Sequence, residues 1–143
     1  LNYYKKNCII VDFGTTTTFD IADFRNIYQG GVIAPGISLS LTALNQFTAK
    51  LPLIKITKQK KVIGKDTKSA INSGVFLGYA CLINGILNKI FHQTKKKYLI
   101  ILTGGYSNLF KSVIDFKSIV NQQITLYGLA KVVKQNKRLF SEI

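Results

Sequence analysis

The chain has 143 residues, of which 47% are hydrophobic, so it is long and apolar enough to form a globular domain with a sizeable core. It carries 20 basic and 6 acidic residues, a net charge of +14. This balance favours anionic partners in general, but the lysines come in short runs without a nucleic-acid-binding motif. The longest apolar stretches are broken by Asn, Ser and Gly, and we expect no membrane-spanning segment.

Three neighbouring strands are expected near the start of the chain. The apolar run at residues 8–12 predicts a buried strand. Residues 16–22 alternate polar and apolar side chains, which indicates a second strand joined to the first through a tight turn at Gly14. A third strand is expected over residues 27–33 and leads into a helix over about residues 37–47.

The rest of the chain is expected to alternate helices with one strand. Residues 50–64 predict a loop with at most one short strand, and a long helix is expected over residues 68–92, with Asp66 and Thr67 as N-cap candidates. We then expect a buried strand and two helices, at residues 98–102, 106–113 and 126–135. This order, without a domain boundary, predicts a single α/β layered domain over residues 1–143.

Several side chains of the long helix and its neighbours carry structural predictions. Gly74 and Gly78 lie on nearly the same helix face, and since interior glycines weaken helices, something such as another helix or a second subunit is expected to pack there. Cys8 and Cys81 follow no metal or redox spacing, and their apolar surroundings predict buried, reduced thiols, which suit the cytoplasm. His92, the single histidine, is expected on the solvated surface.

The stretch VDFGTTTTFD, residues 11–20, has the composition of a phosphate site. Gly14 allows close approach of a ligand and a positive φ, while Thr15 and its neighbours offer hydroxyl and amide donors to phosphate oxygens. Asp12, at the strand end, suits a cation or an ordered water, because a carboxylate would repel phosphate. Asp20 is a possible second carboxylate of the site, and Asp23 is most simply a turn residue. The alternative is a polar hairpin with surface threonines.

Three weaker signals accompany this stretch. Gly104 and Gly105 follow a strand, so a flat ligand could lie against the backbone where α/β folds place ligands, although Gly-Gly is also a common turn. The glycines of residues 30–36 indicate at least a bend. Thr67 is explained by an N-cap, yet a helix terminus that faced the site would also offer amides to an anion.

Taken together and in order, the motifs resemble those of type III pantothenate kinases. The resemblance covers about residues 8–136 and rests on VDFGTTTTFD, YQGGVIAPGISLSLTALNQFTAKLP, GKDTKSAINSGVFLGY, ILTGGYSNLF and ITLYGLAKVVKQN. It implies ATP-dependent phosphorylation of pantothenate to 4′-phosphopantothenate, the first step of coenzyme A synthesis. It also implies the actin-like, ribonuclease H-like fold of the acetate and sugar kinase superfamily, which has two related α/β domains, and for this chain a mixed sheet flanked by helices. It further implies a need for Mg²⁺ and for a monovalent cation (K⁺ or NH₄⁺), and a cytoplasmic homodimer.

The resemblance also implies residue roles. Asp12 matches the monovalent-cation ligand, Thr15 beside Gly14 matches an ATP contact, and Thr67 matches the threonine that contacts pantothenate. Gly104 and Gly105 match the loop on the adenosine side. The long helix with Gly74 and Gly78 would lie near the dimer interface.

The sequence departs from the family pattern in two places. Thr16 stands where members usually carry Ala, a small change. Residues 1–11 match neither the first phosphate motif nor the Gly-x-Asp-Arg motif of the general-base aspartate, so we expect the carboxyl-terminal half of a longer kinase, with its base upstream of Leu1. Two alternatives stay open: a non-catalytic nucleic-acid-binding or transcriptional accessory protein on the same fold, and another kinase of the superfamily.

Overall fold

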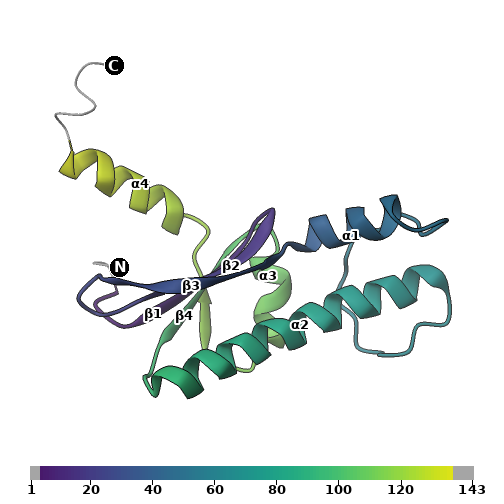
Figure 1. Ribbon diagram of the computed structural model, residues 1–143, viewed down its shortest axis with the longest axis horizontal. Helices are drawn as coiled ribbons and strands as arrows, with labels where there is room; N and C mark the ends of the chain where they lie inside the picture. The colour runs from purple at the N-terminus through teal and green to yellow at the C-terminus, as the bar shows by residue number, and fades with distance from the viewer. Residues whose placement is uncertain (1–3, 137–143) are drawn as a thin grey trace.

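The computed structural model describes residues 4–136 and shows a mixed five-stranded sheet flanked by helices (Figure 1). The strands are β1 (Cys8–Phe13), β2 (Thr16–Ala22), β3 (Tyr28–Pro35), β4 (Leu99–Gly104) and β5 (Ser118–Val120). They lie in the order β3-β2-β1-β4-β5. β2 is antiparallel to both neighbours, whereas β1 pairs in parallel with β4, and β4 with β5. The predicted α/β class with a mixed sheet is confirmed.

The predicted hairpin between the first two strands is confirmed. Phe13 pairs with Thr17 at its closed end, and the Gly14 amide donates to the Thr16 carbonyl at 3.1 Å. The alternation of β2 buries Thr17, Phe19 and Ile21 on one face. This face carries the core, so the pattern of the strand fixes which residues face the other way.

The helices are α1 (Ile37–Gln46), α2 (Thr67–Thr94), α3 (Ser107–Phe110), the 3₁₀ helix η1 (Lys111–Val113) and α4 (Ile124–Gln135). All were expected, although only the first turn of the segment at residues 106–113 is α-helical. No strand forms in residues 50–64. β5 was not predicted, because three residues are too few to show a period.

α2 is the long helix of the core. Asp66 is its N-cap and forms a capping box with Ser69, whose amide donates to Asp66 Oδ1 at 3.0 Å. Thr67 is therefore the first helical residue rather than the cap. The helix ends at Lys95, whose φ of 56° is left-handed. Its 28 residues pack one side against the sheet, and the large buried side chains at this junction are Phe19, Phe76, Phe110, Ile83 and Leu87.

The other side of α2 is uncovered within residues 4–136. A Cβ at Gly74 or Gly78 would meet nothing within 4 Å, so the expectation of a close neighbour there stays a prediction. Cys8 is buried as expected, but Cys81 is exposed, and its predicted burial was wrong. The reason is periodicity: Cys81 follows Gly74 by two helical turns and shares its outward side. His92 is exposed, as predicted.

α2 also bears on the membrane question. Contrary to our expectation, it is long and apolar enough to cross a membrane by length and composition. However, 44% of its most apolar window is buried inside the structure, and core helices of soluble proteins meet the same criterion. α2 is therefore only weak support for a membrane span.

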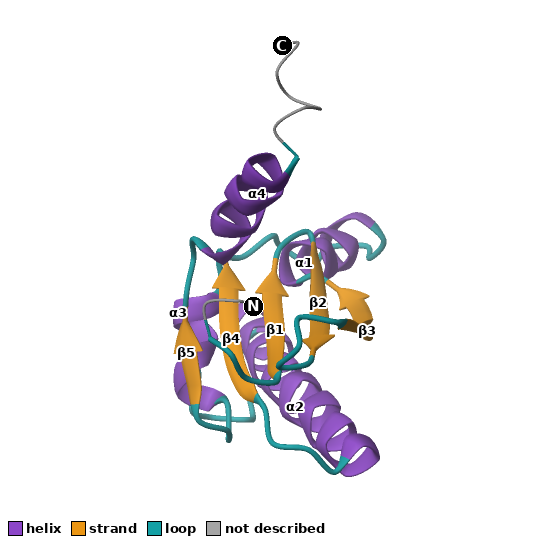
Figure 2. Cartoon of the chain, turned by 90° about the vertical axis from the view of Figure 1, so that its left-hand side faces the viewer, coloured by secondary structure: helices purple, strands orange, loops and turns teal. Residues whose placement is uncertain are grey.

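α4 stands apart from the sheet. Figures 1 and 2 show it beyond the carboxyl ends of β1 and β4, away from the other helices. None of its residues is buried, and Leu126 and Leu129 are exposed by 64% and 59%. A twelve-residue helix is marginal in isolation, so its apolar face is not explained by contacts within residues 4–136.

Candidate functional site

Three glycine-bearing loops meet at the carboxyl ends of β1 and β4. The Gly105 amide donates to the Phe13 carbonyl at 3.2 Å, which ties the loop after β4 to the turn after β1. A Cβ at Gly36, the N-cap of α1, would fall on the backbone of Thr15. The fold thus brings together four of the predicted residues, namely Gly14, Thr15, Gly104 and Gly105.

Asp12 lies beside this junction, on the sheet face opposite the core. It alternates along β1 with Val11 and Phe13, which are buried in the core cluster. Its carboxylate reaches toward the loop after β4, since a Cβ at Gly104 would lie 2.5 Å from Asp12 Oδ1. The predicted grouping of Asp12 with the two glycine loops is what the geometry shows.

Two more polar side chains share that face. Thr18 pairs directly with Asp12 across the hairpin, and Asp20 follows two residues later on β2. The Thr18 hydroxyl donates to Asp20 Oδ2 at 3.1 Å. Within residues 4–136 the sole ion pair joins Arg25 to Asp23, so neither Asp12 nor Asp20 has a cationic partner there. In a chain of net charge +14, this is a local concentration of negative charge.

This setting changes the titration of Asp12. Partial burial raises the pKa of the Asp12 carboxyl above its ordinary value, and the neighbouring charge of Asp20 raises it further. Both effects disfavour the ionised form. An oxygen site whose negative charge has no cationic side chain paired with it in the described part of the chain is suited to a cation.

The raised pKa predicts that Asp12→Asn stabilises the folded chain at neutral pH. Because the folded pKa lies above the unfolded value, the folded state binds more protons in that window, and stability falls as pH rises through it. Asp12→Asn has no carboxyl to ionise and so does not lose this stability. The difference in free energy of unfolding between the variant and the parent should vanish below about pH 4, where the unfolded carboxyl is also protonated. Urea unfolding at several pH values, without added potassium, measures the difference.

The control is Asp115→Asn, which removes the same charge from an exposed loop position. We expect little change in its stability at either pH. If Asp12→Asn were less stable than the parent at neutral pH, the carboxylate would be held by contacts that outweigh its burial.

The glycines of the site differ in what the chain requires of them. Gly104 has a φ of +84°, and an added Cβ would lie 2.6 Å from the Phe13 carbonyl oxygen, so the backbone itself demands glycine. Gly14 was expected to allow a positive φ, but it is not among the residues with one, and a Cβ there would meet only ordinary contacts, starting at 3.6 Å. A Cβ at Gly105 would meet nothing within 4 Å. Space for a ligand therefore remains beside Gly14 and Gly105.

Thr67 does not join this group. It precedes Phe76 by nine residues of α2, which is about 14 Å along a helix axis, and Phe76 packs on Phe110, which stacks on Phe13 beneath the site. Thr67 instead lines a separate hollow of about 860 Å³ with Lys65 and apolar side chains such as Leu44.

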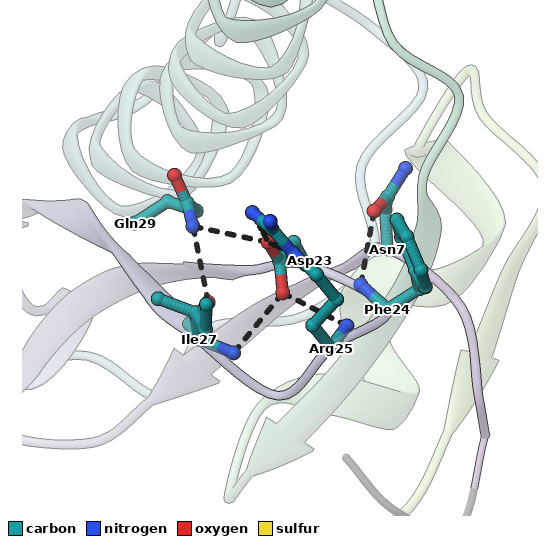
Figure 3. Close-up of polar contacts among 6 residues, drawn as sticks. All are labelled: Asn7, Asp23, Phe24, Arg25, Ile27 and Gln29. Atoms are coloured by element: carbon teal, nitrogen blue, oxygen red, sulfur yellow. Dashed lines mark hydrogen bonds and ion pairs between the residues drawn. The ribbon is translucent and has the colours of Figure 1, made fainter.

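Asp23 is a turn residue, as predicted. Its carboxylate accepts the Ile27 amide at 3.1 Å and the Arg25 amide at 2.9 Å, and pairs with the Arg25 side chain at 2.7 Å (Figure 3). Burial by itself would raise the pKa of the Asp23 carboxyl, but the hydrogen bonds from Arg25 and Ile27 lower it overall. The contacts of the Asp23 carboxylate thus stabilise the β2–β3 turn.

The sequence-based reasoning missed two contributors to the site. Gly36 was considered only within the glycine cluster of residues 30–36 and was given no partner, whereas it packs against the Gly14–Thr15 turn. Thr18 was not singled out, although it faces Asp12. The position of Thr18 could have been found from the hairpin register, because a tight turn at Gly14 places residue 18 opposite residue 12.

Comparison with known proteins identifies the family of the chain. A family model described as type III pantothenate kinase matches residues 1–89, more than half of the chain. A type III pantothenate kinase of Pelagibacter ubique is 48% identical over 127 residues, covering 89% of this chain and 51% of that protein. One of Hyphomonas neptunium is 42% identical over 134 residues, covering 94% and 52% respectively.

A solved structure shows a similar fold. The chain is similar, with a TM-score of 0.59 and 21% identity, to a Campylobacter jejuni protein named as a Baf family transcriptional activator, covering 96% of this chain and 62% of that one. The chain spans about half the length of the curated relatives it matches. On the family model and these relatives, the chain belongs to the type III pantothenate kinase family.

Proposed function

We propose that the protein to which this chain belongs phosphorylates pantothenate with ATP, giving 4′-phosphopantothenate for coenzyme A synthesis. The observation that carries the proposal is the meeting of the Gly14–Thr15 turn, the Gly104–Gly105 loop and Asp12 at one end of the sheet, in a chain of this family. Backbone amides and hydroxyls there can bind phosphate oxygens, and phosphoryl transfer depends mainly on positioning and charge stabilisation.

We propose the following residue roles, which the resemblance implies and this arrangement supports. Gly14 and Thr15 would bind ATP phosphate, and Gly104 and Gly105 would let adenosine approach the backbone, with open space at Gly14 and Gly105 in support. Asp12 would hold the monovalent cation, K⁺ or NH₄⁺, because its carboxylate lacks a cationic partner within residues 4–136. Mg²⁺ would be bound through the ATP phosphates and would offset their charge.

Thr67 is the proposed pantothenate contact. Its hollow combines a hydroxyl, the Lys65 ammonium and apolar walls, which suits a small molecule with a carboxylate and an aliphatic body. Because Thr67 lies away from the phosphate loops, the substrate would have to extend toward them, or Thr67 would serve the site of a second subunit.

The same proposal covers assembly and architecture. We propose that residues 1–143 form one domain of a two-domain, actin-like and ribonuclease H-like kinase, with the mixed sheet and its helices as support. We propose a cytoplasmic homodimer, supported by the uncovered glycine side of α2 at Gly74 and Gly78. We assign no general base within residues 4–136 and expect it in the half of the kinase that this chain does not match. The nucleic-acid-binding alternative is not favoured, because the family match is to kinases.

Pantothenate-dependent ADP release tests the proposal. The chain is assayed alone and together with the unmatched half of the Pelagibacter ubique relative, in potassium and in sodium. We expect release only in the combined sample, only with pantothenate, and more in potassium. ATP binding by the chain alone is followed through the amide NMR signals of Gly14, Thr15, Gly104 and Gly105. If ADP release and shifts at these amides were both absent, the kinase proposal would be refuted.

A matched pair of variants tests the ATP contact. Thr15→Val should weaken ATP binding by about tenfold or more, since a hydrogen bond to a charged group contributes about 1.5–3 kcal/mol. Thr16→Val, at the neighbouring position where family members usually carry Ala, should leave binding nearly unchanged. Equal losses in both variants would contradict a specific role for Thr15.

A further inference from the structure

A second hollow lies at the opposite end of the sheet from the proposed phosphate site. It has a volume of about 500 Å³ and is lined by residues just before β1, β4 and β5 and by the β2–β3 turn. β1 separates the two ends, and its six residues span about 20 Å. Figure 2 shows the starts of β1, β4 and β5 together at the end of the sheet away from α4.

The charged lining of this hollow is entirely basic. Lys6, Lys97 and Lys117 come from three different segments, and no carboxylate lines the hollow with them. None of the three forms an ion pair within residues 4–136. Convergence of like charges is unfavourable, if weakly so in water, and an anion bound between them would relieve it.

The frame around the lysines is fixed by hydrogen bonds. The Asn7 side chain accepts the Phe24 amide at 3.1 Å and donates to the Lys97 carbonyl at 3.3 Å, while the Leu99 amide donates to the Asn7 carbonyl at 2.9 Å. Asp23 holds the same turn from inside (Figure 3). Asn7 thus ties together the segments that carry Lys6, Lys97 and Phe24.

Aromatic rings supply the apolar part of the lining. Phe24 is 63% exposed although its backbone is fixed, and Arg25 lies 5.9 Å from its ring centre. Tyr98 is half-buried against Phe91, with ring centres 5.6 Å apart. An exposed aromatic ring on a fixed backbone, beside lysines that form no ion pair within residues 4–136, is suited to stacking on a flat ring that carries phosphate.

We propose that this hollow binds a nucleotide with two or more phosphate charges, held by Lys6, Lys97 and Lys117 and stacked on Phe24. The three ammonium groups match the charge of a diphosphate, and Phe24 selects for an attached ring. The site lies apart from the Gly14–Thr15 turn, so it would bind a nucleotide in addition to the proposed ATP site.

The test is a titration of the ¹⁵N-labelled chain with ADP, pyrophosphate or adenosine, read by amide NMR shifts. Near this hollow the reporters are Asn7, Phe24 and Leu99, and Gly14 and Gly104 report on the other end. We expect saturable shifts at the first group with ADP, weaker binding of pyrophosphate and none of adenosine. Absence of shifts at Asn7, Phe24 and Leu99 would overturn the proposal, whatever happens at Gly14 and Gly104.

Variants with matched charge loss separate a built site from general basicity. The triple substitution Lys6→Gln, Lys97→Gln and Lys117→Gln should weaken ADP binding at this hollow by about tenfold, because each exposed ion pair contributes modestly. The control replaces Lys58, Lys60 and Lys61 with Gln. These exposed lysines lie in the loop before α2, and their replacement should leave ADP binding at the hollow unchanged. Phe24→Ala should reduce ADP affinity to that of pyrophosphate. Equal weakening by both triple variants would mean non-specific attraction and would sink the proposal.

Discussion

Gly104→Ala should destabilise the fold by about 2–5 kcal/mol, which is the sum of two costs. A non-glycine residue at a φ of +84° costs about 1–2 kcal/mol. The added Cβ would also lie 2.5 Å from Asp12 Oδ1 and 2.6 Å from the Phe13 carbonyl oxygen, and such overpacking costs about 1–3 kcal/mol. Because backbone is one of the colliding groups, the clash cannot be relieved by a side-chain rotation alone.

The next residue offers the control for Gly104→Ala. A Cβ at Gly105 would meet nothing within 4 Å, and its φ is not positive, so Gly105→Ala should change stability by less than about 0.5 kcal/mol. Urea unfolding followed by circular dichroism measures both variants. A Gly104→Ala protein as stable as the parent would mean that the loop after β4 adopts another conformation.

Phe110→Ala should cost about 3–5 kcal/mol, the range for deleting a fully buried phenyl ring. Phe110 is 0% exposed, and its ring lies 5.3 Å from Phe13, 5.2 Å from Phe76 and 6.5 Å from Tyr79. It joins α3 and α2 to the end of β1, directly beneath the turn at Gly14. Its removal should therefore weaken ligand binding at that turn as well as the fold.

Phe47→Ala is the matched control for Phe110→Ala, because it deletes the same ring from the end of α1, where it is 85% exposed. We expect a change of less than about 0.5 kcal/mol in urea unfolding. Comparable losses in the two variants would show that exposed Phe47 is covered in solution, for example by a second copy of the chain.

Local patterns predicted most of the fold. The boundaries of β2 were right because strict alternation marks Thr17, Phe19 and Ile21 as one face. α2 was recognised from its apolar period and its Asp66 cap. β5 was not predicted, because three residues are too few to show a period. It is held in place by pairing with β4, which is distant in the sequence. Cys81 was misplaced because α2 is apolar on more sides than the sheet covers.

Some features of the candidate site can likewise be recognised in the sequence, whereas others depend on the tertiary structure. The residue types that suit phosphate and cation binding, Asp12, Thr15 and the glycine pair at 104–105, are visible in the sequence because chemistry requires them in short motifs. Asp20 was also considered from the sequence as a second carboxylate of the site, but its position near Asp12 on the open sheet face follows from the hairpin register. The basic hollow at Lys6, Lys97 and Lys117 is not visible in the sequence, because its lysines are 91 and 20 residues apart along the chain.

The sequence by itself determined the family, the α/β order of elements and the turn chemistry, because hydrophobic period, caps and glycine motifs act over a few residues. Only the tertiary structure decided which glycines the backbone requires. Gly104 must be glycine because Asp12 and Phe13 crowd it, whereas Gly14 has room. It also decided that Thr67 lies in a separate hollow and that one side of α2 is uncovered. These properties arise from contacts between distant segments, which no local pattern encodes.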